Sequence, residues 1–192
     1  ELKIENEKLE IDNPPVFLMN LINGGAHSSN NLSFQEYLVS VDSGDARKNL
    51  ETGFAIYKKV KNLYPNAGLG DENGLSLNFE NSIKPLSALK DIIKDFGNDR
   101  NIGLGVDVAA NNFFKNNGYV VDGKTINNEE LFGIYASLIN EFNLNYIEDP
   151  FYEDDFENFS KLTNKYPQVI ISGDDLTSTN PELIKRAIEK KS

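Results

Sequence analysis

Three acidic residues stand at or just after the ends of three short apolar segments. They are Asp107, Glu148 and Asp174, which come after the segments IGLGV, YI and VIIS. Because the carboxyl ends of parallel strands lie on one rim of an α/β fold, we expect these three carboxylates to converge. Carboxylate oxygens that leave room for waters and substrate oxygens suit Mg2+, which prefers octahedral oxygen coordination. The spacing therefore predicts a magnesium site.

Each of these acids also has a simpler interpretation. Asp and similar residues often cap the N-terminus of a helix or lie in a solvated loop. That interpretation is weaker for the three together, because Asp149 and Asp175 add a second negative charge at two of the strand ends. Crowded like charges are costly unless a cation or a basic group neutralises them.

Three further residues could take part in acid–base chemistry. His27 is the only histidine and follows the flexible turn NGGA, although a lone histidine in a loop is often just a surface residue. The alternation of the strand around Glu36 places this acid on the same face as Phe34, which is unusual for a carboxylate. Glu72 lies in GLGDENG, which lacks the lysine of a phosphate-binding loop, so we interpret it as an acid on a mobile loop.

Composition excludes several classes of protein. The 192 residues contain 19 Lys and Arg against 30 Asp and Glu, a net charge of −11, so the average surface field would repel a nucleic-acid backbone. Apolar runs such as Val16–Met19 are too short to span a bilayer. The absence of cysteine excludes a disulfide scaffold, a thiol nucleophile and a cysteine-ligated zinc site. We therefore expect no nucleic-acid partner and no membrane span.

The elements that must position these residues begin with two strands and two helices. Short apolar or alternating runs predict strands at Val16–Leu21 and Phe34–Val41. Helical periodicity follows in Ala46–Leu63 and Pro85–Phe96. In the first helix the apolar stripe, which we expect to be buried, consists of Leu50, Phe54, Tyr57 and Val60.

Strands and helices then alternate. The sequence predicts a strand at Ile102–Val108 and a helix at Glu129–Phe142, and the pattern repeats twice, ending in a helix capped by Asn180 with Pro181 at its first position. Such alternation is typical of a parallel sheet or barrel. We predict one α/β domain, either a small open sheet or the first part of an eight-stranded barrel, which needs roughly 250 residues when complete.

Six stretches, in order and with matching spacing, resemble the enolase family, the phosphopyruvate hydratases of glycolysis. The resemblance runs from about Pro15 to Pro181, and its stretches are LINGGAHSSNN, FQEY, GDENG, VDVAANNFF, YIEDPFYEDDF and SGDDLTSTNP. It implies an enolase-type (β/α)8-like barrel that starts ββαα and continues as βα repeats. Residues 15–192 would be part of this catalytic barrel domain, and residues 1–14 a boundary segment.

The resemblance also implies a role for each candidate residue. Asp107, Glu148 and Asp174 match the ligands of the essential Mg2+, Glu36 and Glu72 match an acidic pair around the departing hydroxyl, and His27 matches a loop histidine that closes over the substrate. The implied reaction is the reversible dehydration of 2-phosphoglycerate to phosphoenolpyruvate in the cytoplasm. The family resemblance further implies a homo-oligomer, a dimer or an octamer, when the protein is complete.

Some family features have no counterpart in the sequence. The N-terminal capping domain and the later part of the barrel, with its base lysine and phosphate-gripping loop, are not matched, so we expect these 192 residues alone to be inactive. Asn73 also stands where the family usually has Gly. A shortened, non-catalytic enolase-like binding or scaffold protein is the main alternative. Another superfamily member acting on a different carboxylate is a third, although the HSSNN and GDENG loops argue against it.

Overall fold

The computed structural model describes residues 16–96 and 102–192. The predicted boundary segment 1–14 lies outside them. The strands are β1 (Phe17–Asn23), β2 (Glu36–Val41), β3 (Gly68–Leu69), β4 (Leu75–Ser76), β5 (Ile102–Asp107), β6 (Phe114–Lys115), β7 (Gly118–Val121), β8 (Lys124–Ile126), β9 (Leu144–Glu148) and β10 (Ile170–Ser172). The helices are α1 (Ala46–Leu63), α2 (Lys84–Ile93), α3 (Asn128–Phe142), α4 (Phe156–Lys165), α5 (Asp174–Thr177) and α6 (Pro181–Lys190), with 3-10 turns η1 (Gly25–His27), η2 (Lys94–Phe96) and η3 (Ala110–Phe113).

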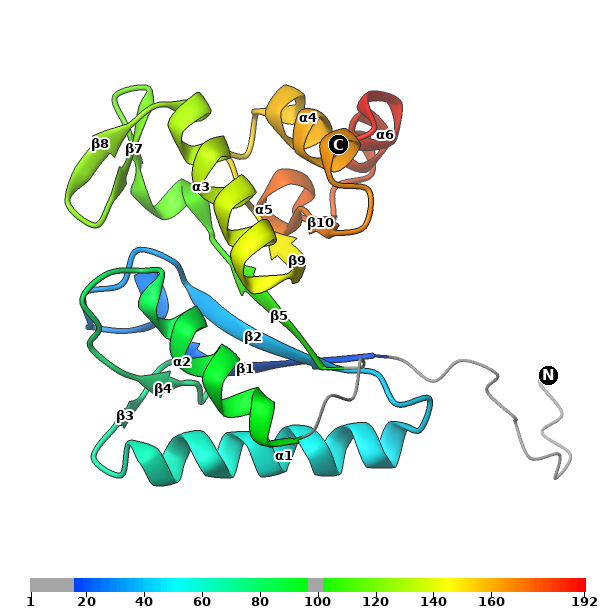
Figure 1. Cartoon of the computed structure of the whole chain (residues 1–192). Coiled ribbons are helices and arrows are strands. Elements are labelled where there is room, and N and C mark those ends of the chain that lie inside the picture. Colours follow the sequence, from blue (N-terminus) through cyan, green and yellow to red (C-terminus); the bar gives the residue numbers. More distant parts are fainter. Residues whose placement is uncertain (1–15, 97–101) are drawn as a thin grey trace, which may run out of the picture.

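Seven strands form one mixed sheet in the order β10-β9-β5-β2-β1-β4-β3. The strands β5, β9 and β10 are parallel to one another, whereas β2 runs antiparallel to both of its neighbours, β1 and β5. The predicted ββαα start and the later βα repeats are confirmed (Figure 1). Because β10 and β3 are the two edges, the sheet is not closed into a barrel in the described part of the chain.

The helices pack one after another along the sheet. Helix α1 contacts β1 and β2, α2 contacts β5, α3 contacts β9, and α4 contacts β10 (Figure 1). Between the helices and the strands lies a continuous core of buried apolar side chains, which includes Ile22, Val39, Ile56, Leu89, Val106, Leu138, Ile147 and Phe159. Burial of this apolar surface is the main favourable term in folding the sheet.

Side-chain caps fix where the helices begin. Asp45 accepts hydrogen bonds from the backbone of Arg47 and Lys48 at the start of α1. Asn127 and Glu130 form a capping box at the start of α3, which satisfies two otherwise unpaired backbone donors. The predicted cap at Asn180 is confirmed, since its Oδ1 accepts a hydrogen bond of 2.9 Å from the backbone of Glu182.

Helix α1 has the predicted bounds, but its buried face differs from the predicted stripe. Leu50 and Phe54 are 54% and 52% exposed, so that part of the prediction is wrong. The residues that face the core are Asn49, Gly53, Ile56 and Val60. The reason is close packing at Gly53, because a Cβ there would lie 1.8 Å from the Sδ of Met19. The helix turns its smallest residue, rather than its largest apolar ones, toward β1.

A second sheet, antiparallel and three-stranded, consists of β6, β7 and β8, which follow β5 and precede α3 in the sequence. This sheet was not predicted. Both of its hairpins use two-residue turns in which each turn residue has positive φ, first Asn116 and Asn117, then Asp122 and Gly123. Asp122 also connects this sheet to the turn that precedes α2, because its Oδ1 accepts a 2.6 Å hydrogen bond from Ser82 Oγ.

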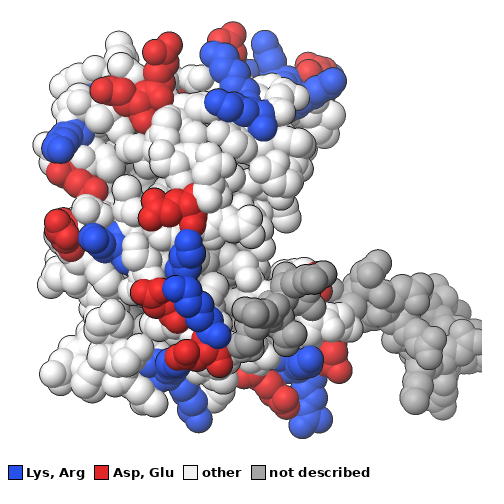
Figure 2. Space-filling view, viewed as in Figure 1, with Lys and Arg blue, Asp and Glu red and all other residues white. Residues whose placement is uncertain are grey.

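Acidic and basic side chains are interspersed over the face shown in Figure 2. That face therefore does not carry a charge of a single sign. Within the described ranges, none of the helices combines the length and the apolar character that crossing a bilayer would take.

Candidate functional site

A polar cavity of about 530 Å³ gathers all six predicted site residues. Its lining consists of His27, Gln35, Glu36, Glu72, Asp107, Ala109, Asn112, Glu148, Asp149, Asp174 and Asp175. These residues come from the carboxyl ends of β5, β9 and β10, from the start of the antiparallel β2, and from the loops after β1 and β3. The cavity therefore forms on the rim where strand ends meet, as the sequence predicts.

Strand register aligns the central acids. Glu36 of β2 pairs with Asp107 of β5, and Asp107 pairs in turn with Glu148 of β9. Ser172 of β10 continues the row beside Glu148. Because directly paired residues on neighbouring strands point to the same face of a sheet, the register brings three carboxylates side by side.

His27, Glu36 and Glu72 form the tightest group in the cavity. Each offers one ligand atom, and these three atoms all lie within 4.8 Å of one another. His27 Nδ1 lies 3.2 Å from Glu36 Oε1, but the ring is not oriented for a hydrogen bond. The predicted ligands Asp107, Glu148 and Asp174 line the same cavity, but among the residues that the structure describes they do not form a group this tight.

Two of the predicted ligands are oriented by hydrogen bonds. Asp107 Oδ2 accepts from Gln35 Nε2 and Asp107 Oδ1 accepts from the backbone of Ala109, each at 3.0 Å. Glu148 Oε2 accepts a 2.7 Å hydrogen bond from the hydroxyl of Tyr146, two residues earlier on β9. These donors fix the two carboxylates in place, and each carboxylate keeps free lone pairs for a further partner.

The third strand end carries Asp174 and Asp175 at the start of α5. Asp174 is exposed, and Asp175 Oδ2 accepts a 3.0 Å hydrogen bond from Asn111 Nδ2. The neighbouring Asp149 is buried, with only 3% of its surface exposed. Asp149 Oδ2 accepts from the backbone of Asp175 at 2.9 Å, whereas its Oδ1 is buried without a hydrogen-bond partner.

Burial and mutual repulsion raise the pKa values of these acids. Desolvation, a hydrogen bond with Glu72 and the nearby negative charges raise the pKa of Glu36 from 4.5 to about 9. Desolvation and the charges of Glu148 and Asp149 raise the pKa of Asp107 to about 7. Desolvation also raises the pKa of Asp149 to about 7 and that of Glu148 above its ordinary value. The cluster therefore binds protons more tightly than isolated carboxylates do.

The donor set fits a hard divalent cation. No Lys or Arg lines the cavity, so none of its lining residues supplies a permanent positive charge to balance the acids. Carboxylate oxygens are the ligands that Mg2+ prefers, and Asp149, whose Oδ1 is buried without a hydrogen-bond partner, is one of the lining residues. A cation bound here would replace the protons that the cluster otherwise holds.

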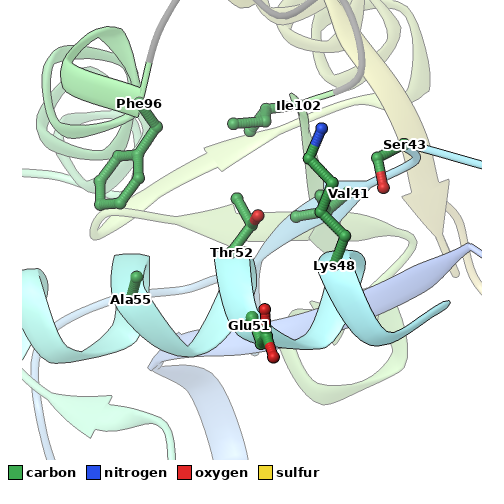
Figure 3. A pocket seen from close by; sticks show the side chains of 8 residues that line it. All are labelled: Val41, Ser43, Lys48, Glu51, Thr52, Ala55, Phe96 and Ile102. Atoms are coloured by element: carbon green, nitrogen blue, oxygen red, sulfur yellow. The ribbon is translucent and has the colours of Figure 1, made fainter. Parts of the chain in front are cut away.

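Another cavity, of about 410 Å³, lies between α1 and the start of β5 (Figure 3). It is lined by Val41, Ser43, Lys48, Glu51, Thr52, Ala55, Phe96 and Ile102. Glu51 is the only acid among these residues, so this cavity offers no comparable ligand set. Phe96 and Ile102 flank residues 97–101, which lie outside the described residues.

Sequence reasoning missed two supporting residues of the site. Gln35 donates to Asp107 and accepts a 3.0 Å hydrogen bond from Asn112 Nδ2, so a chain of amides leads from η3 to the acid. Gln35 directly precedes Glu36 in FQEY, and Asn112 lies in VDVAANNFF. Their places within two of the matched stretches were the available signal, because amide side chains close to carboxylates commonly orient them.

Comparison with known proteins gives a consistent result. Residues 13–192 match the family model described as "Enolase, C-terminal TIM barrel domain". The chain is 37% identical over 185 residues to the enolase of Sulfolobus acidocaldarius, covering 93% of this chain and 44% of that protein. It is 36% identical to the enolase of Methanocaldococcus jannaschii, with 92% and 43% covered, and 34% identical to that of Neorickettsia sennetsu, with 92% and 44% covered. The chain thus spans less than half the length of these relatives.

Proposed function

The chain belongs to the enolase family, and on that premise we propose that the complete protein is a lyase that reversibly dehydrates 2-phosphoglycerate to phosphoenolpyruvate with Mg2+. The observation that carries this proposal is the aligned row of Glu36, Asp107 and Glu148 across β2, β5 and β9. Acids on adjacent strands, in a cavity without Lys or Arg, need a cation or protons to offset their charge.

Asp107, Glu148 and Asp174 would hold the Mg2+. When bound there, the ion would supply positive charge to the carboxylate oxygens of the substrate and so make the adjacent carbon acidic. Hydrogen bonds from Gln35 and Ala109 orient the carboxylate of Asp107, and one from Tyr146 orients that of Glu148. Neither side chain therefore needs to move far to act as a ligand. Asp174 is the most exposed of the three.

Glu36 and Glu72 would assist loss of the hydroxyl group. Their ligand atoms lie within 4.8 Å of each other, and the pKa of Glu36 is raised to about 9, so Glu36 retains a proton at neutral pH. Hydroxide is a poor leaving group, and a carboxylic acid held beside it can donate the proton that converts it to water. The proton held by Glu36 is the one the reaction would use.

His27 would complete the wall of the site on the side of Glu36. It sits in the 3-10 turn after β1, with its Nδ1 3.2 Å from Glu36 Oε1. From this place it can contact a substrate oxygen only while the turn stays near Glu36 and Glu72.

Residues 15–192 are proposed to form one part of the catalytic barrel domain. A cytoplasmic location and a homo-oligomer, dimer or octamer, belong to the same proposal and rest on the family resemblance.

A spectroscopic assay of the full-length gene product tests the function. The full-length product is needed because the chain spans less than half of the relatives' length. We expect formation of phosphoenolpyruvate from 2-phosphoglycerate that stops when Mg2+ is chelated and resumes when it is added back. A folded full-length protein without this activity would contradict the proposal and would favour a non-catalytic binding role.

A further inference from the structure

Two segments that are far apart in the sequence carry two of the candidate catalytic residues. We define the His27 segment as residues 23–32 and the Glu72 segment as residues 70–79. They meet because β1 and β4 are parallel neighbours, with Asn23 paired with Ser76. In addition, the backbone N–H of Asp71 donates a 3.1 Å hydrogen bond to the carbonyl of His27, and Ser28 Oγ lies 2.5 Å from Ser76 Oγ at the end of β4.

Asn30 is the residue that bridges the two segments most directly. Its Nδ2 donates to the carbonyl of Asn23 at 2.7 Å, within the His27 segment, and to the carbonyl of Leu77 at 2.8 Å, in the Glu72 segment. Its Oδ1 accepts a 3.2 Å hydrogen bond from the backbone of Leu32. One amide group therefore closes the His27 segment on itself and fastens it to the Glu72 segment.

A second asparagine extends this connection at the surface. Asn31 Nδ2 donates to the carbonyl of Phe79, and Asn31 Oδ1 accepts a 3.3 Å hydrogen bond from the backbone of Phe79. Asn31 is exposed, whereas Asn30 is only partly exposed. Because a hydrogen bond shielded from water is more costly to lose, Asn30 should contribute more to holding the segments together.

The Glu72 segment also lies directly against the end of β1. A Cβ at Gly74 would come within 2.3 Å of Asn23 Oδ1, and a Cβ at Gly70 within 2.5 Å of Asn23 Cβ. Both positions therefore need glycine for this close approach. With so little free space, the Glu72 segment cannot shift relative to β1 unless the contacts made by Asn23 and Asn30 change.

We propose that Asn30 is a positioning residue that joins the two segments into one unit, so that His27 and Glu72 keep their spacing over Glu36. The short separation of the three ligand atoms depends on this connection, because Glu72 is exposed and has the Asp71–His27 backbone bond as its nearest anchor to the His27 segment. The effect of Asn30 on catalysis rests on the proposed function, whereas the physical connection between the two segments does not.

Hydrogen–deuterium exchange at the N–H of Asp71 tests the connection, since this amide is released only when the segments separate. Asn30→Asp keeps the shape of the side chain but removes both N–H donors. We expect exchange at Asp71 to accelerate about tenfold relative to the amides of β5. Ser29→Ala, at an exposed neighbouring position, is the matched control and should leave Asp71 unchanged.

Unchanged exchange at Asp71 in a folded Asn30→Asp protein would overturn the inference, as would acceleration confined to the His27 segment. If that variant does not fold, Ser28→Ala removes the contact with Ser76 and is measured in the same way. It should accelerate exchange at Asp71 about twofold to threefold, and no acceleration would again overturn the inference.

Turnover of the full-length product separates this inference from the proposed function. We expect Asn30→Asp to lower kcat about tenfold while KM changes less than about threefold, because the acid pair is misplaced but the other substrate contacts remain. If the wild-type protein has no enolase activity but Asn30→Asp still accelerates exchange at Asp71, the proposed function is refuted and the connection between the segments is retained. If the wild-type protein is active and Asn30→Asp changes neither the exchange at Asp71 nor kcat, the proposed function is retained and the connection is refuted.

Discussion

Glu36 lies beside Glu72 in a setting that keeps the Glu36 carboxyl group protonated at neutral pH. Burial, a mutual hydrogen bond and the charges of Asp107 and Glu148 act in the same direction on Glu36 and hold its pKa near 9. At the scale of single residues, Glu36 thus holds a proton beside Glu72, and removing either carboxyl group should affect proton transfer more than binding.

Replacing Glu72 by Gln should lower kcat of the full-length product by about 10²- to 10⁴-fold, because loss of an acid–base partner commonly costs that much. KM should change far less, since the ligands proposed for the cation are intact. Steady-state kinetics measure both. Asp71→Asn removes a neighbouring exposed charge from the same loop and serves as the control. Equal losses of kcat in the two variants would mean that Glu72 acts only through the negative charge that it adds to the loop.

The positions of all six site residues could be predicted because each lies next to a strand end or in a loop between predicted elements. The spacing of the strands did not indicate which of these residues lie closest together, although the family resemblance implied the pair of Glu36 and Glu72. The sequence predicts convergence of Asp107, Glu148 and Asp174, whereas the closest group contains His27, Glu36 and Glu72. The difference arises from β2, whose antiparallel direction brings its first residue, rather than its last, to the rim. Periodicity gives a strand's position but not its direction.

At the scale of elements, α1 shows that the size of apolar residues does not decide which face of a helix is buried. Gly53 permits the close approach of Met19, and the amide of Asn49 accepts hydrogen bonds from Ser43, so the buried face contains residues that a hydrophobic pattern passes over. Leu50 and Phe54 remain at the surface, where the ring of Phe54 contacts the ammonium group of Lys58.

Gly53→Val should therefore reduce the free energy of unfolding by about 1–3 kcal/mol, because the added carbons would overlap Met19. Phe54→Ser should change it by less than about 0.5 kcal/mol, since the ring is half exposed. Denaturant titration of both variants measures the two free energies. A larger loss for Phe54→Ser than for Gly53→Val would restore the predicted stripe as the buried face.

The order of the main strands and helices was predictable because each has a clear hydrophobic period and is bounded by turn-forming or helix-capping residues. The small sheet of β6, β7 and β8 was not, since its strands are only two to four residues long and show no period. A local signal was nevertheless present, because Asp122-Gly123 between two short runs favours a hairpin turn. Helix α5 is a single turn of four residues and leaves no periodic pattern at all.

At the scale of the whole molecule, a net charge of −11 and a cavity that concentrates acids act together. Glu36, Asp107 and Asp149 have ordinary pKa values of 4.5, 3.8 and 3.8, but about 9, 7 and 7 in the folded protein. Between those limits the folded state binds more protons than the unfolded state. The stabilising contribution of these groups is therefore complete at low pH and is lost as pH rises through the folded pKa values.

The Tm of the protein in the presence of a chelator should accordingly fall as pH increases from about 5 to about 9. Saturating Mg2+ should raise the Tm, and more at about pH 8 than at about pH 6, because the cation competes with protons for the same oxygens. Thermal unfolding followed by circular dichroism measures this. A Tm that rises with pH without metal, or a Mg2+ effect independent of pH, would contradict the charge balance assigned to the cavity.

The central claim is that the carboxylates on this rim hold a divalent cation, and calorimetric titration of the full-length product with Mg2+ tests it most directly. The wild-type protein should bind Mg2+, and Glu148→Gln should abolish this binding while the fold is retained. Glu141→Gln, which removes an exposed acid at the end of α3, should bind like the wild type. Unchanged Mg2+ affinity in a folded Glu148→Gln protein would show that the carboxylate is only structural and would contradict the account.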